Sequence, residues 1–150
     1  MEHFLKSDQA EDTTIHNMWT LAAITNGSES QIKEVLGMDI GDVLLACLNS
    51  KNYRLLIPTL KTIGNIFAGE DEDSQILLNT GIIGGLYHCL ENEHHIVRKN
   101  AAWVYSNILA GTQDQVQEVF DFEYGIIIDK LIYLVHKDEK VEVIIQKKNE

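Results

Sequence analysis

The sequence lacks the features that mark membrane-spanning, secreted and disulfide-stabilised proteins. No apolar run approaches the roughly 18 to 20 residues that cross a bilayer, and residues 1–12 have neither the basic start nor the apolar middle of a signal peptide. The two cysteines, Cys47 and Cys89, stand 42 positions apart, which fits small buried residues better than a disulfide or a metal pair. These absences favour an intracellular protein that does not engage membranes.

Positive charge is scarce. Lys and Arg number 12 against 23 Asp and Glu, which gives a formal net charge of -11. Such a surface repels nucleic acid and anionic lipid and favours basic partners. We therefore expect no nucleic-acid or membrane partner, and the charge favours basic segments of other proteins.

Motifs for catalysis and metal binding are also missing. His88, Cys89, His94 and His95 lie close in the sequence, but no C-x-x-C or H-E-x-x-H spacing accompanies them. The glycines in 81–85 lack the G-K-[ST] ending of a phosphate-binding loop and follow no strand. No serine, histidine and aspartate arrangement carries a nucleophile motif. We expect neither an enzyme nor a bound cofactor or metal.

What the sequence does contain is a repeat, and its best copy is the segment RKNAAWVYSNILAGTQDQVQE, residues 98–118. Trp103 and Asn107 are four positions apart in a run of good helix formers, so their side chains lie on one stripe of a helix. Gly111 ends that helix, and a glutamine-rich helix follows. The segment therefore predicts a helix, a turn and the start of another helix.

Two earlier segments repeat this pattern at intervals of 42 residues. The segment KTIGNIFAGEDEDSQIL places Lys61 at the position of Trp103 and Asn65 at the position of Asn107. The segment WTLAAITNGSESQIKEV begins with Trp19 at the first of these positions. A period near 40 predicts units that bury their apolar faces against one another rather than around one centre.

Apolar spacing at i, i+3, i+4 and i+7 predicts helices in the repeated region, in the order short helix, helix, long helix. Strands are the competing interpretation for runs such as GIIID and VEVII. Residues 1–14 are polar and without period, and we interpret them as a flexible leader without secondary structure. The expected helices cover 15–25, 30–36, 39–48, 53–67, 74–79, 83–91, 96–109, 113–120 and 126–135, with a last one from about 141.

Two details refine these boundaries. Proline costs about 3 kcal/mol in a helix interior but little in the first turn, so the helix around Pro58 either starts near Leu56 or Ile57 or bends. Gly125 follows Gly81 by 44 residues, so the last unit carries a slip of two residues. The expected units are a partial repeat at 15–27, then 28–69, 70–111 and a truncated repeat at 112–150.

The segments PTLKTIGNIFAGEDEDSQ and NAAWVYSNILAGTQDQVQEV closely resemble armadillo repeats in the C-terminal half of importin alpha, a family of nuclear-import adaptors. The resemblance covers roughly residues 15 to 143. Its most specific part is the W-x-x-x-N helix followed by A-G and a glutamine-rich helix. The resemblance implies an all-α, right-handed armadillo-repeat superhelix, an α-solenoid of about three repeats, similar to the family's fifth to eighth repeats.

The resemblance also implies a binding site. In that family the third helix of each repeat lines a concave groove, where asparagines bond the main chain of an extended nuclear localisation signal and tryptophans form slots for its Lys and Arg stems. An amide has both a donor and an acceptor for this task, and a Trp face attracts a cation while covering its methylenes. Carried over by position, the peptide-binding residues are Trp19, Lys61, Asn65, Trp103 and Asn107.

The sequence departs from the family pattern at several groove positions. Ala23 stands where an Asn or Tyr is expected, and Lys61 places a cation on a surface that receives cations. Three positions before each Trp position, where the family often has an acid, this chain has His16, Pro58 and Asn100. We therefore expect weak binding of basic nuclear localisation signal peptides, by a protein of the cytoplasm and nucleus.

The chain also lacks the Arg-rich N-terminal segment by which the family engages importin beta, so that partner is not expected. A structural role is the alternative hypothesis. In that case the armadillo scaffold packs on other proteins, or on itself, through uncapped end faces and binds no cargo. Binding of a Lys-rich peptide that depends on Trp103 and Asn107 separates the two hypotheses.

Overall fold

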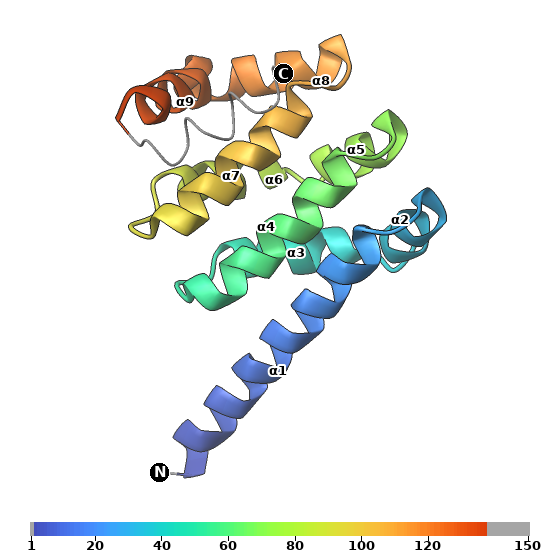
Figure 1. Ribbon diagram of the computed structural model, residues 1–150, viewed down its shortest axis with the longest axis vertical. Coiled ribbons are helices and arrows are strands. Elements are labelled where there is room, and N and C mark those ends of the chain that lie inside the picture. Colours follow the sequence, from blue (N-terminus) through green and yellow to red (C-terminus); the bar gives the residue numbers. More distant parts are fainter. Residues whose placement is uncertain (1, 138–150) are drawn as a thin grey trace.

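Three long helices, α1, α4 and α7, run side by side and order the molecule (Figure 1). The computed structural model describes residues 2–137, with side chains from residue 9 onward. Within that range every regular element is a helix and no strand is present. The all-helical prediction is therefore confirmed, and the strand interpretation of GIIID is wrong because Gly125 ends η1 and the next four residues begin α9.

The helices follow the predicted order of short helix, helix and long helix. In Figure 1 the long helices succeed one another through the stack, and the shorter helices of each unit pack beside them. Apart from the start of α1, the predicted bounds hold to within one turn. The elements are α1 (Glu2–Thr25), α2 (Glu29–Leu36), α3 (Ile40–Leu48), α4 (Tyr53–Phe67), α5 (Asp71–Leu78), α6 (Ile82–Leu90), α7 (His95–Ile108), α8 (Gln113–Asp121), the 3-10 turn η1 (Phe122–Gly125) and α9 (Ile126–Lys137).

Local sequence fixes several of the helix starts. At α8, the Thr112 hydroxyl accepts from the backbone N–H of Gln115 (3.3 Å), and the Gln115 side chain accepts from the N–H of Thr112 (3.2 Å). At α4, the Asn52 side chain accepts from the N–H of Arg54 at 2.9 Å. Before α6, Gly81 adopts a φ of 77°, which a residue with a side chain rarely takes.

The slip of two residues in the last unit is visible in the backbone. Gly125, which precedes α9, has a φ of 89° and so shares the left-handed conformation of Gly81 before α6. This match confirms the alignment of the two glycines. The extra length is taken up in η1, where Glu123 and Tyr124 also have positive φ values, 41° and 61°.

Pro58 lies inside α4, which begins at Tyr53. The predicted alternative, a start near Leu56 or Ile57, is therefore wrong. The cap provided by Asn52 fixes the earlier start. In the second turn the proline removes one backbone hydrogen bond, and burial of the apolar face of α4 offsets that loss.

The interpretation of residues 1–14 as a leader without secondary structure is wrong for the described part of that segment, because α1 already begins at Glu2. A helix nucleated by packing in its C-terminal half extends at little cost, because each added residue gains a backbone hydrogen bond without a new nucleation step. The second unit also contacts this extension, since Asn52 Nδ2 donates to Glu11 Oε1 at 3.0 Å. Sequence periodicity missed the extension because residues 2–14 show no apolar period.

One continuous apolar core runs through the stack, as the repeat predicts. Its centre is α4, where Leu60, Ile63 and Ile66 are fully buried. Between α6 and α7, the Tyr105 hydroxyl donates to the carbonyl oxygen of Ile83 at 3.0 Å. This large side chain is therefore buried without an unpaired polar group.

Cys47 and Cys89 are free and buried, which confirms their interpretation as small interior residues. Burial raises the pKa of Cys89 to about 12, so its thiol stays protonated at neutral pH. Across residues 9–137, no His, Cys, Asp and Glu side chains form a group of three that could hold a metal ion. No described helix has the length and apolar character needed to cross a bilayer. The predicted helix from about Val141, and with it the run VEVII, lies outside the described residues.

Candidate binding groove

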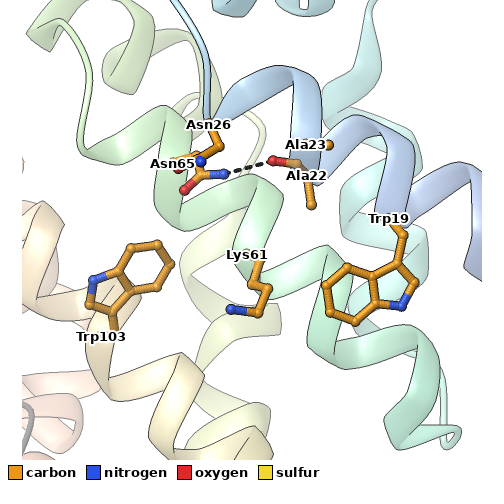
Figure 2. Close-up of a pocket in the computed structure, with 7 residues that line it drawn as sticks. All are labelled: Trp19, Ala22, Ala23, Asn26, Lys61, Asn65 and Trp103. Atoms are coloured by element: carbon orange, nitrogen blue, oxygen red, sulfur yellow. Dashed lines mark hydrogen bonds between the residues drawn. The ribbon is translucent and has the colours of Figure 1, made fainter.

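Four of the five predicted site residues line one pocket that crosses the three long helices (Figure 2). Trp19 comes from α1, Lys61 and Asn65 come from α4, and Trp103 comes from α7. The pocket has a volume of about 390 Å³. Its full lining is Trp19, Ala22, Ala23, Asn26, Lys61, Asn65 and Trp103.

Trp103 is held in place by the unit before it. Its side chain is partly buried, and the six-membered part of the ring lies directly against Gly64 of α4. A Cβ atom on Gly64 would overlap that ring, so glycine is the residue that lets the indole approach the helix this closely. Trp19, in contrast, is 44% exposed.

Lys61 stands between the two indoles. Figure 2 shows its side chain between Trp19 and Trp103, on the helix that separates their helices. Lys61 is exposed, and no described residue forms a hydrogen bond or an ion pair with its ammonium group. The middle of the pocket therefore carries a positive charge that has no partner among the residues the structure describes.

Asn65 and Asn107 make the same contact in successive units. Asn65 Nδ2 donates to the carbonyl oxygen of Ala22 at 3.0 Å, the dashed bond in Figure 2, and to Thr25 Oγ1 at 3.3 Å. Asn107 Nδ2 donates to the carbonyl oxygen of Gly64 at 2.8 Å. Each amide nitrogen thus ties its helix to the long helix of the preceding unit, a role that sequence reasoning missed.

The two asparagines differ in how accessible they are. Asn107 is only 5% exposed and lies outside the pocket of Figure 2, whereas Asn65 is partly buried and lines it. Each also lines a smaller pocket at the end of its long helix, of about 240 Å³ in both units. That either side chain contacts a peptide stays a prediction.

Negative charge lies next to the Trp-lined pocket. The smaller pocket beside Asn65 is lined by Glu29, at the start of α2, and by Glu70, which precedes α5. Glu29 pairs with Lys33 one turn along α2, and both side chains are about half exposed. The groove therefore has a cation at Lys61 and anions one pocket away.

Sequence reasoning also missed Gly64, although a signal for it was present. A glycine in the interior of a strongly apolar helix usually has a packing reason. No sequence signal pointed to the backbone acceptors at Ala22 and Gly64. The helical pattern of one unit does not identify which carbonyl of the preceding unit its asparagine contacts.

Comparisons with known proteins agree with this geometry. The chain is 30% identical over 112 residues to Importin subunit alpha-1a of Oryza sativa subsp. japonica, an alignment that covers 74% of this chain and 21% of that protein. It is 32% identical over 130 residues to Importin subunit alpha-9 of Arabidopsis thaliana, with 82% of this chain and 25% of that protein covered. Over most of its own length, the chain is similar to importin alpha subunits.

Solved structures of armadillo repeat proteins have the same scaffold as this chain. A designed armadillo repeat protein in complex with the peptide (KR)4 matches 87% of this chain and 54% of its own, with a TM-score of 0.81 and 26% identity. A second designed armadillo repeat protein matches 85% of this chain and 52% of its own, with a TM-score of 0.77 and 26% identity. The predicted armadillo architecture is therefore confirmed.

Two further findings bound the comparison. No protein-family model matches the chain. The chain also spans only 21% to 25% of the length of the two importin alpha relatives named above.

Proposed function

We propose that this protein is a nuclear-import adaptor-like module that binds basic nuclear localisation signal peptides along its armadillo groove. The observation that carries the proposal is the pocket built by Trp19, Asn65 and Trp103 from three successive long helices. Two findings support it: the relatives are named as importin alpha subunits, and a designed protein of the same fold was solved with the peptide (KR)4.

The tryptophans would hold the stems of basic side chains. An indole face covers methylene groups and attracts the terminal cation, which contributes about 0.5 to 2 kcal/mol per contact. Trp103 is already fixed against Gly64, so binding costs little ordering of that ring. Trp19 is the more exposed of the two and has more apolar surface left to cover.

Asn65 would hold the peptide main chain through its side-chain oxygen. Its amide nitrogen is already engaged with Ala22 and Thr25. No described residue donates to Asn65 Oδ1, so that atom is the one available to accept a peptide N–H. An acceptor of this kind holds one point of the peptide main chain without selecting its side chains.

Charge supports a basic ligand over a longer range. The chain has a net charge of -11, and Glu29 and Glu70 lie one pocket from the tryptophans. Attraction by such exposed charges weakens as salt screens it. We place the protein in the cytoplasm and nucleus on the same grounds as its function, as a proposal that follows from its importin alpha relatives.

A titration of a fluorescently labelled Lys-rich peptide tests the proposal. The wild type should bind weakly, with higher affinity at low salt, and Trp19→Ala and Trp103→Ala should each weaken binding by about 2- to 30-fold. Phe120→Ala is the matched control, because Phe120 is also an exposed aromatic side chain but lies on α8 and does not line the pocket. Equal affinities for all four proteins would contradict the proposal.

The second candidate function is a scaffold that packs on other proteins without binding cargo. Large apolar side chains exposed away from the pocket favour it: Val43 on α3, and Ile132 and Tyr133 on α9. Sedimentation of the purified chain measures association directly. A protein that associates through these helices and ignores the peptide would be the scaffold, whereas a monomer that binds the peptide would not.

A further inference from the structure

We propose that the peptide preferred by this groove carries an acidic residue opposite Lys61, between two basic residues that face Trp19 and Trp103. The inference rests on the proposed function, since it names the peptide class that the same pocket accepts. It concerns the order of charges along the ligand, which net charge alone does not determine.

The positions of three side chains set the order. Trp19, Lys61 and Trp103 come from α1, α4 and α7, and these helices lie side by side in that sequence (Figure 1). All three side chains line one pocket, with Lys61 between the indoles in Figure 2. A peptide laid across the helices therefore meets an aromatic face, a cation and a second aromatic face.

The charge on Lys61 has nothing to neutralise it in the described part of the chain. No described residue forms a hydrogen bond or an ion pair with its ammonium group. Glu29 and Glu70 line the adjacent pocket and not the one that contains Lys61, and Glu29 already pairs with Lys33. An uninterrupted basic peptide would place like charge against Lys61, whereas an Asp or Glu at that point would form an ion pair there.

This pattern differs from that of the ligand in the related designed structure. The peptide (KR)4 is basic at every position. Here the cation at Lys61 occupies the wall between the two aromatic slots, so one point along the ligand is better filled by an anion. Specificity of this kind comes from repulsion of the wrong ligand as well as from attraction of the right one.

Three labelled peptides of equal length test the inference. One is all basic, one has a single Glu at its centre, and one has the same Glu at its end, so the last two share one net charge. The wild type should bind the central-Glu peptide about two- to fivefold more tightly than either of the others, the range expected for one exposed ion pair.

Reversal of the charge at Lys61 gives a second test of the inference. Lys61→Glu should invert the preference, so that the all-basic peptide becomes the tightest ligand and the central-Glu peptide the weakest. Lys51→Glu is the matched control, because Lys51 is exposed, lies before α4 and does not line the pocket. It makes the same change in net charge and should leave the order of the three peptides as in the wild type. Circular dichroism spectra confirm that each variant is folded.

The outcomes separate this inference from the function on which it rests. If no peptide binds to the wild type or the variants, the proposed function fails. If the wild type binds all three peptides equally, or binds the all-basic one most tightly, the function stands and the role of Lys61 is overturned. The same holds if Lys61→Glu and Lys51→Glu shift the affinities alike.

Discussion

The joint between α1 and α4 and the joint between α4 and α7 are built on one plan but differ in the groove. In both, an asparagine amide donates to a main-chain carbonyl of the preceding long helix, at Ala22 for Asn65 and at Gly64 for Asn107. The side chains that face the groove differ between the two joints. Trp103 lies on Gly64, whereas Ala22 shares its pocket with the unbranched Lys61.

A second pair of equivalent positions, on the short helices α5 and α8, also differs between the units. Gln115 Nε2 in α8 donates to the carbonyl oxygen of Asp71 at 2.8 Å. Its equivalent 42 residues earlier is Asp73, which is 3% exposed and whose Oδ2 has no hydrogen-bond partner among the described residues. The carbonyl equivalent to that of Asp71 belongs to Glu29, and a carboxylate cannot donate to it. Asp73 thus lacks the hydrogen bond that Gln115 makes at the equivalent position of the next unit.

Replacement of Gly64 should have the largest effect on the free energy of unfolding. Gly64→Ala should lower the free energy of unfolding by as much as about 3 kcal/mol, because the added Cβ overlaps the Trp103 ring. Gly84→Ala is the control, since a Cβ there meets Phe122 at an ordinary 3.7 Å and gains helix propensity. Chemical denaturation measures both, and a Gly64→Ala variant as stable as Gly84→Ala would show that the ring needs no glycine.

Exchange of the short-helix residues should have the next largest effect. Gln115→Asp should cost about 2 kcal/mol, because it removes the donor to Asp71 and buries a carboxylate. Asp73→Gln should instead gain about 1 kcal/mol by supplying the missing donor. Thermal or chemical unfolding of the two variants checks the signs, and a loss of stability in both would mean that the two joints are not equivalent.

Loss of the asparagines should distinguish the two long-helix joints. Asn107→Ala should lower the free energy of unfolding by about 1 kcal/mol, since the amide is buried, and Asn65→Ala by about half as much, since Asn65 is only partly buried. Denaturant midpoints at constant slope report the difference. A larger loss at Asn65 would show that burial of the amide does not determine how much each asparagine contributes.

Alkaline pH should reveal the smallest difference, between the equivalent cysteines. Burial raises the pKa of Cys89 to about 12 from the usual 9.0, and it also raises the pKa of Cys47, where a hydrogen bond with Thr59 acts in the opposite direction. The stabilising contribution of Cys89 is therefore complete below about pH 9. It is lost as pH rises towards about 12, because the unfolded chain releases the thiol proton first.

Paired substitutions isolate that contribution. Cys89→Ala should flatten the alkaline decline of stability more than Cys47→Ala does, whatever each costs at neutral pH. Unfolding free energies measured between pH 8 and pH 11 give the two slopes. Equal slopes would show that burial acts alike on the two thiols.

The repeat made most of the fold predictable, and the features that were missed depend on contacts between units. Because positions 42 residues apart repeat their pattern, the sequence predicted the helix order and the aligned glycines. The resemblance to importin alpha implied one groove for Trp19, Lys61, Asn65, Trp103 and Asn107, and all of these except Asn107 line the pocket. The extension of α1 to Glu2 was missed because contacts with the second unit, not an apolar stripe, accompany it. The asparagine bonds were missed because their acceptors lie on another unit's backbone.

The two tryptophans offer the most direct measurement of the central claim, that three long helices form one ligand-binding wall. The chain has only two, Trp19 and Trp103, and both line the pocket. Addition of a basic peptide with a central Glu should therefore change the intrinsic tryptophan emission, with Trp19→Phe and Trp103→Phe each removing part of the change. Peptide binding detected by anisotropy while the tryptophan emission stays constant would contradict the account.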